Sequence, residues 1–131
     1  MRPSIGGHLR IARFDHWVKN VFVLPGIIVA VSMQPENLDF AALVVRSILG
    51  LLSTGLIASS NYVLNEILDA PHDRLHPIKK NRPVPSGQVN IPLGYVQWLV
   101  LMALGVAVGA LISTSFVVAL LSLWVMGIVY N

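Results

Sequence analysis

The chain has 131 residues, of which 55% are hydrophobic and only 11% are charged, a composition that excludes an ordinary soluble domain and predicts a protein embedded in lipid. The net charge of +3 does not indicate a nucleic-acid partner, because the basic residues lie in short stretches between apolar runs and form no basic face with interleaved aromatic side chains. Cysteine is absent, which excludes disulfides, thiolate metal sites and cysteine nucleophiles and leaves oxygen or imidazole groups as metal ligands.

Four apolar stretches follow one another along the chain, at residues 17–33, 47–64, 91–112 and 116–130. A helix needs roughly 20 apolar residues to cross the hydrocarbon of a bilayer, with a lower limit near 17. The third stretch meets this length, whereas Pro25-Gly26 interrupts the first and the fourth is short. We expect a single all-α integral membrane domain over residues 1–131, with four transmembrane helices.

The basic residues predict the orientation of the chain in the membrane. They precede the first apolar stretch, lie at its start or lie between the second and the third: Arg2, Arg10, Arg13, Lys19, Arg74, Lys79, Lys80 and Arg82. Because Lys and Arg accumulate on the cytoplasmic side of a membrane, we expect the N-terminus and the loop at residues 65–90 to be cytoplasmic, in a plasma or inner membrane. Arg46 would then lie at the outer edge of the second helix.

The end of the second helix carries the densest polar chemistry of the chain. An amide and three carboxylates occur there, at Asn65, Glu66, Asp69 and Asp73. At 100° per residue, the first three of these and Tyr62 fall within an arc of about 100°, so that their side chains converge. Pro71 disfavours helical geometry at Ala70 and lacks a backbone donor, so we expect Asp73 to approach from a loop or a new turn.

This combination of groups predicts a site for Mg²⁺ bound to a diphosphate. Clustered carboxylates repel one another unless a cation joins them, and Mg²⁺ prefers a few carboxylates together with phosphate oxygens and water. Basic side chains, the usual partners of phosphate oxygens, follow within a few residues: Arg74, Lys79, Lys80 and Arg82. The prolines and the glycine of this loop would stiffen it and hold its charges over the helix end.

Other interpretations of these residues stay open. Membrane orientation alone would also produce a basic loop, and the carboxylates could cap a helix end at the interface. His72 and His76 have the spacing of a zinc pair, but Pro71 interrupts the helix that such a pair would need, and no third soft ligand is evident. Gly105 and Gly109 form a GxxxG spacing that indicates close helix packing. A channel or transporter has little support, because no ionisable residue lies in the middle of a span.

The polar segment resembles the first aspartate-rich motif of the UbiA superfamily of membrane prenyltransferases, NDxxDxxxD. It stands here as Asn65-Glu66-x-x-Asp69-x-x-x-Asp73, followed by a basic, proline-containing loop that runs to Ser86-Gly87. This loop and the upstream stretch Arg13-Phe14-Asp15-His16-Trp17-Val18-Lys19-Asn20 are similar to the branch that contains decaprenyl-phosphate phosphoribosyltransferases. The resemblance implies an all-helical bundle of about nine spans around a lipid-facing cavity, of which this chain would form the N-terminal half.

The resemblance also implies a role for each polar residue. The residues that would hold the cofactor Mg²⁺ on the donor's diphosphate are Asn65, Glu66, Asp69 and Asp73, with Asp69 and Asp73 as catalytic carboxylates. Glu66 stands where the family usually has aspartate, so the carboxylate is kept but its reach is one methylene longer. The residues that would balance the charge of the diphosphate are Arg13, Lys19, Arg74, Lys79 and Arg82.

Three functions are compatible with this resemblance. The first is Mg²⁺-dependent transfer of a prenyl group from a polyprenyl diphosphate to an acceptor. In the second, phosphoribosyl pyrophosphate is the donor and a polyprenyl phosphate is the acceptor. The third is a non-catalytic small membrane protein derived from the same fold. Because the family's second aspartate-rich motif lies in the half that this chain does not contain, catalysis would need a missing C-terminal half, in a longer frame or a second chain.

Overall fold

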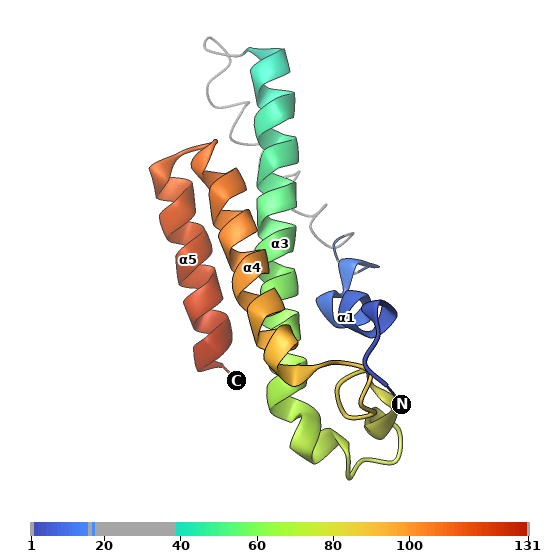
Figure 1. The fold of residues 1–131 in the computed structure, drawn as a ribbon. Helices are drawn as coiled ribbons and strands as arrows, with labels where there is room; N and C mark the ends of the chain where they lie inside the picture. The colour runs from blue at the N-terminus through green and yellow to red at the C-terminus, as the bar shows by residue number, and fades with distance from the viewer. Residues whose placement is uncertain (1, 16, 18–38, 131) are drawn as a thin grey trace.

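The computed structural model of the chain describes residues 2–15, 17 and 39–130. All regular structure in these ranges is helical: α1 (Ile5–Ala12), α3 (Phe40–Asp73), the short 3-10 helix η3 (Lys79–Asn81), α4 (Ile91–Ala110) and α5 (Thr114–Val129). Figure 1 shows α4 and α5 as a hairpin along one flank of α3, and α1 on another flank near the end of α3 from which the loop leaves. We call this end of α3, residues 62–73, its loop end.

The long helix α3 is the axis of the fold, and its 34 residues extend over about 51 Å. The helix begins after Asp39, whose carboxylate accepts hydrogen bonds from the backbone N–H groups of Ala41 and Ala42. Its outward faces are apolar, with exposed side chains such as Val45 and Ile48. Such a surface suits lipid or the apolar faces of further helices.

The expectation that Pro71 separates Asp73 from the helix is wrong, because α3 continues through Pro71 to Asp73. Pro71 cannot donate a backbone hydrogen bond, but it lies in the last turn of the helix, where only one such bond is lost. The N–H of Arg74, which follows the last residue of the helix, still bonds to the carbonyl of Ala70 at 3.0 Å. Asp73 therefore lies on the same face as Glu66, two turns earlier in the helix.

The contact between α3 and α4 depends on glycines of α4. The helix begins at Asn90, whose side chain accepts a hydrogen bond from the N–H of Leu93. Gly94 and Gly105 are buried against α3, where a Cβ at Gly105 would lie 3.1 Å from the Cδ1 atom of Ile57. Gly109 faces α5 and leaves room for Leu120. The predicted packing role of the GxxxG spacing is confirmed, and its two glycines serve two different neighbours.

A polar contact joins the three long helices within their apolar surroundings. The hydroxyl of Ser60 in α3 donates a hydrogen bond to the carbonyl of Trp98 in α4 at 2.7 Å and accepts one from the indole N–H of Trp124 in α5 at 3.0 Å. The rings of Trp98 and Trp124 stack with their centroids 5.0 Å apart. This contact fixes the register of α4 and α5 against α3, because the Ser60 hydroxyl and the Trp124 indole N–H would be costly to leave without partners in apolar surroundings.

The predicted spans agree with the structure in part. The stretch 47–64 lies inside α3 and the stretch 91–112 corresponds to α4, and these two helices are long and apolar enough to cross a membrane. The stretch 116–130 forms most of α5, which is apolar but has only 16 residues. The stretch 17–33 lies outside the described residues except for Trp17, whose indole N–H donates to the Ser59 hydroxyl at 2.7 Å. The count of four spans stays a prediction.

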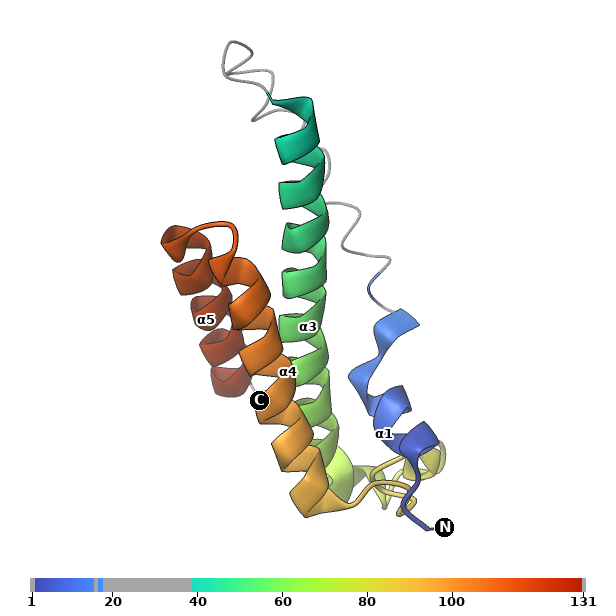
Figure 2. The ribbon, with the colours of Figure 1, turned by 45° about the horizontal axis from the view of Figure 1, so that its top comes forward.

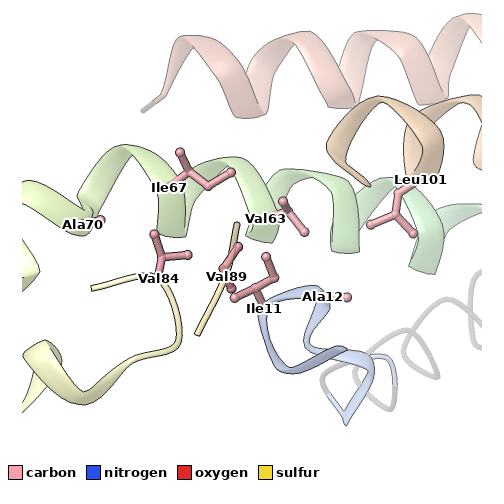
Figure 3. Packing of buried hydrophobic residues seen from close by; sticks show 8 residues of the cluster. All are labelled: Ile11, Ala12, Val63, Ile67, Ala70, Val84, Val89 and Leu101. Carbon is pink, nitrogen blue, oxygen red and sulfur yellow. The ribbon is translucent and has the colours of Figure 1, made fainter. Parts of the chain in front are cut away.

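The buried apolar core lies at the loop end of α3 rather than in the middle of the hairpin. Figure 2 shows α1 and the segment before α4 meeting α3 at this end. Four parts of the chain contribute to the cluster in Figure 3, which consists of Ile11, Ala12, Val63, Ile67, Ala70, Val84, Val89 and Leu101. The core therefore fixes α1 and the loop beside the helix face that carries the predicted site.

Replacing Gly105 by leucine is expected to destabilise the bundle, because the added atoms would collide with Ile57 and with the carbonyl oxygen of Ser53, 3.2 Å from a Cβ at this position. Overpacking of this kind costs about 1–3 kcal/mol. Thermal unfolding of the protein in detergent would measure the loss. Ala107→Leu, on an exposed face of the same helix, is the control, and equal melting temperatures of the two variants would contradict the expectation.

Candidate functional site

The loop end of α3 presents its polar side chains along one face. Because the helix continues to Asp73, all four predicted metal ligands and Tyr62 share an arc of about 100°. Glu66 and Asp73 are buried, Asn65 is half-buried and Asp69 is exposed. One edge of this polar face is thus covered by protein, and the edge that carries Asp69 is open.

Asp73 forms an ion pair with Arg82 of the loop. The distance between Asp73 Oδ2 and Arg82 Nη1 is 3.2 Å, and the exposed fractions of the two side chains are 7% and 36%. A buried carboxylate is stabilised only if a cation or hydrogen-bond donors lie beside it. Arg82 supplies the positive charge and the hydrogen-bond donor, and its contact with Asp73 holds the loop against the end of the helix.

Glu66 lies deeper on the same face, with 2% of its surface exposed. The positive charges that act on its carboxylate are those of Arg13 and Arg82, and the backbone N–H of Val84 donates a hydrogen bond to it. Three segments that are distant in the sequence therefore meet at this carboxylate: the end of α1, the loop and α3. The side chain of Glu66, one methylene longer than the aspartate usual in the family, thus points toward Arg13, Arg82 and the backbone of Val84.

Arg13 reaches the site from the end of α1. It caps the helix in the left-handed conformation, with φ of 52° and ψ of 50°, and among the described residues it is the only one other than glycine with a positive φ. This conformation costs a side-chain-bearing residue roughly 1–2 kcal/mol. It directs the guanidinium group over the ring of Tyr62, 5.3 Å from the ring centroid, where a cation–π contact holds it.

The loop between α3 and α4 is folded by its own hydrogen bonds. The Nδ1 atom of His76 accepts hydrogen bonds from the N–H groups of Ile78 and Lys79, both at 3.1 Å, at the start of η3. The Ser86 hydroxyl donates to the Arg82 carbonyl at 2.7 Å, and Gly87 turns the chain with φ of 85°. These bonds return the chain to α3 and place Arg82 against Asp73.

The remaining predicted diphosphate ligands lie on the outside of the site. Arg74 and Lys79 are exposed at the loop surface, so they could contact a large anion only from the solvent side. Lys19 lies outside the described residues. The structure therefore brings Arg13 and Arg82 to the polar face and leaves Arg74 and Lys79 at its margin.

No preassembled metal cage exists in the described part of the chain, where no three His, Cys, Asp or Glu side chains lie close enough together to hold an ion. The alternative of a zinc pair at His72 and His76 gains no support, because His72 lies in the last turn of α3 while His76 Nδ1 accepts hydrogen bonds from the loop backbone. Mg²⁺ is usually held by one or two carboxylates with phosphate oxygens and water. Asp69 and Asn65, at the open edge, fit such a partial ligand set.

Two features of the site are not evident from local sequence patterns. Tyr62 was placed on the polar face by its spacing, but its contact with Arg13 joins residues 49 positions apart. The second feature is a set of hydrogen bonds between α1 and the start of α4, which includes a bond from the Gln97 side chain to the His8 carbonyl at 2.9 Å. The only sequence signal for it is a glutamine within the apolar stretch 91–112.

Comparisons with known proteins point to one family. The model of the UbiA prenyltransferase family matches residues 21–131. The chain is 33% identical over 85 residues to decaprenyl-phosphate phosphoribosyltransferase of Mycolicibacterium smegmatis, covering 65% of this chain and 26% of that protein. It is 37% identical over 93 residues to the nodulation protein NoeC of Azorhizobium caulinodans, covering 71% and 28%.

A third relative is named for a different activity. Digeranylgeranylglyceryl phosphate synthase of Sulfurisphaera tokodaii is 30% identical over 79 residues, covering 60% of this chain and 28% of that protein. The aligned segment thus spans little more than a quarter of each of these relatives. No solved structure matches the chain.

Replacing Arg82 by alanine is expected to release the loop from α3, because it leaves the buried carboxylate of Asp73 without its ion pair. Removing one partner of a fully buried pair costs about 3–5 kcal/mol, and less here because Arg82 is partly exposed. Limited trypsin digestion in detergent would report the release as faster cleavage after Lys79 and Lys80. The control is Arg74→Ala, which removes an exposed loop arginine; equal cleavage rates in both variants would sink the expectation.

Proposed function

The chain belongs to the UbiA prenyltransferase family, and from this premise we propose that it contributes the diphosphate site of a Mg²⁺-dependent membrane transferase. The observation that supports this proposal is the meeting of Glu66, Asp73, Arg13 and Arg82 at the loop end of α3. Carboxylates and guanidinium groups from three segments lie together there, in a chain that has few charges elsewhere. Carboxylates bind a metal ion and guanidinium groups bind an anion, so a site for a metal ion together with its anion needs both kinds of group.

We assign the residues roles according to their exposure. Asp69 and Asn65, at the open edge of the polar face, would hold Mg²⁺ through their side-chain oxygens. When bound, the ion would neutralise negative charge that develops on the leaving diphosphate. Glu66 and Asp73 would complete the carboxylate set and, in the state described here, orient Arg13 and Arg82.

The guanidinium groups would act on the diphosphate oxygens. Arg binds phosphate through two parallel N–H donors, and charge-assisted hydrogen bonds of this kind are about twice as strong as neutral ones. Because Asp73 and Tyr62 hold Arg82 and Arg13 in place, little reorganisation is needed as the leaving group gains charge. Arg74, Lys79 and Lys19 would attract the diphosphate electrostatically from the edge of the site. The loop at residues 65–90 would face the cytoplasm.

Two donor classes share this leaving group, and the first is a polyprenyl diphosphate. In prenyl transfer, the allylic C–O bond breaks, the diphosphate departs, and an acceptor nucleophile bonds to the allylic carbon and loses its proton. The apolar helix faces next to the site would keep water from the reacting carbon. The family description supports this reaction type.

The second donor class is phosphoribosyl pyrophosphate. In that reaction an oxygen of a polyprenyl phosphate bonds to the anomeric carbon of the ribose as the diphosphate departs. The similarity to decaprenyl-phosphate phosphoribosyltransferase supports it. Because the aligned segment spans only part of each relative, we propose that further helices complete the cavity in either case and that they select the donor.

Replacing Asp69 by alanine is expected to lower kcat/KM about 100-fold or more while leaving the melting temperature unchanged, because the side chain is exposed and would act on the metal and diphosphate alone. The assay uses the full-length gene product in membranes with Mg²⁺. It compares transfer of label from a polyprenyl diphosphate with transfer from phosphoribosyl pyrophosphate to a polyprenyl phosphate. Chelation of Mg²⁺ should abolish whichever activity is found.

The matched control for this variant is Asp39→Asn, which changes an aspartate of α3 at the opposite end but keeps a capping side chain. It should retain activity. Full activity of Asp69→Ala, or activity that survives removal of Mg²⁺, would overturn the proposed chemistry. Label transfer from only one donor would assign the reaction.

A further inference from the structure

The helix α1 is fastened to the start of α4 by a closed set of polar contacts. The His8 Nδ1 atom lies 2.9 Å from the Gln97 Oε1 atom, and the Gln97 Nε2 group donates to the His8 carbonyl at 2.9 Å. The backbone N–H of Asn90 donates to the His8 Nε2 atom at 3.2 Å. Both ring nitrogens of His8 and both ends of the Gln97 amide are therefore used.

These contacts fix the proton of the imidazole ring. Nε2 accepts a hydrogen bond from the Asn90 N–H, so the ring proton lies on Nδ1 and points to Gln97 Oε1. The orientation of the amide is fixed independently, because its Nε2 group must donate to the His8 carbonyl. The network therefore has one consistent arrangement of donors and acceptors.

A close backbone approach presses the same helix onto the segment before α4. The N–H of Ser4 donates to the Gln88 carbonyl at 2.9 Å. One turn later, a Cβ at Gly7 would collide with that carbonyl, whereas a Cβ at Gly6 would meet nothing closer than 3.9 Å. Position 7 therefore tolerates only glycine as long as α1 is docked.

The position of Arg13 follows from the docking of α1. Arg13 lies five residues after His8, about 7.5 Å further along the helix direction, and caps α1 over Tyr62 and beside Glu66. We propose that His8 and Gln97 are positioning residues, which hold the guanidinium group of Arg13 in the diphosphate site. This inference rests on the function proposed above.

A positioning role and a purely structural role make different predictions for combined variants. If His8 acts through Arg13, its removal has no further effect on diphosphate binding once Arg13 is absent. If His8 only stabilises the fold, the two losses add, as they do for independent sites. A double-mutant cycle therefore separates the two roles.

The cycle is measured on the full-length protein in lipid nanodiscs, with inorganic pyrophosphate and Mg²⁺ as the probe. His8→Ala is expected to weaken binding about tenfold or more, the size of effect that follows loss of a hydrogen-bonded charge. The double variant His8→Ala/Arg13→Ala should bind no more weakly than Arg13→Ala alone. His8→Asn, which keeps a donor at the Nδ1 position toward Gln97, should recover part of the loss. Additive losses would overturn the positioning role.

Docking of α1 can be followed separately by labelling a cysteine introduced into α1, because the chain contains no cysteine of its own that would react. Ile11 is fully buried, so a thiol in Ile11→Cys should react slowly with a maleimide, and faster after His8→Ala or Gly7→Ala. Gly6→Ala is the matched control and should leave the rate unchanged. Unchanged labelling after His8→Ala would overturn the network. Absence of pyrophosphate binding in the wild type would instead overturn the proposed function, while the labelling still reports whether the network docks α1.

Discussion

Glu66 and Asp73 are buried carboxylates at one end of a long apolar helix, and they require cations beside them. Removing a carboxylate from water is costly unless an opposite charge and hydrogen-bond donors replace the solvent. The helix α3 offers no such partners nearby, so they come from other segments, Arg82 from the loop and Arg13 from α1. Compensation of these charges therefore accompanies the docking of the loop and α1 on α3, and burial of Ile11, Val84 and the other residues of the apolar core stabilises it.

The helical hairpin gives this site a rigid base. Gly94 and Gly105 allow α4 to lie close against α3, and Ser60 joins α3 to both α4 and α5 through the two tryptophans. In lipid, where apolar contact alone gives helices little reason to associate, small residues and interhelical hydrogen bonds provide the attraction. Gln97 lies on α4 in the same arrangement, so the position of α4 against α3 also sets the position of α1.

Much of this organisation could be predicted from the sequence, because it depends on local patterns. Hydropathy located α4, glycine spacing indicated its packing, and the 3.6-residue period placed Asn65, Glu66 and Asp69 on one face. The extent of α3 was predicted wrongly at Pro71, since a proline in a last turn removes only one hydrogen bond. The pairs Asp73–Arg82 and Tyr62–Arg13, and the fastening of His8 to Gln97, could not be predicted, because each joins segments whose approach depends on the whole fold. The metal set and the number of spans stay predictions.

The balance of charges at the loop end of α3 bears on how a metal and a diphosphate would bind there. Glu66 and Asp73 lie beside Arg13 and Arg82, and Asp69 lies at the open edge, so negative and positive groups occur together on this face. In the proposed function, Mg²⁺ held by Asp69 and Asn65 would add positive charge beside these guanidinium groups and so favour binding of phosphate oxygens. Metal and diphosphate would therefore each raise the affinity for the other, as linkage requires.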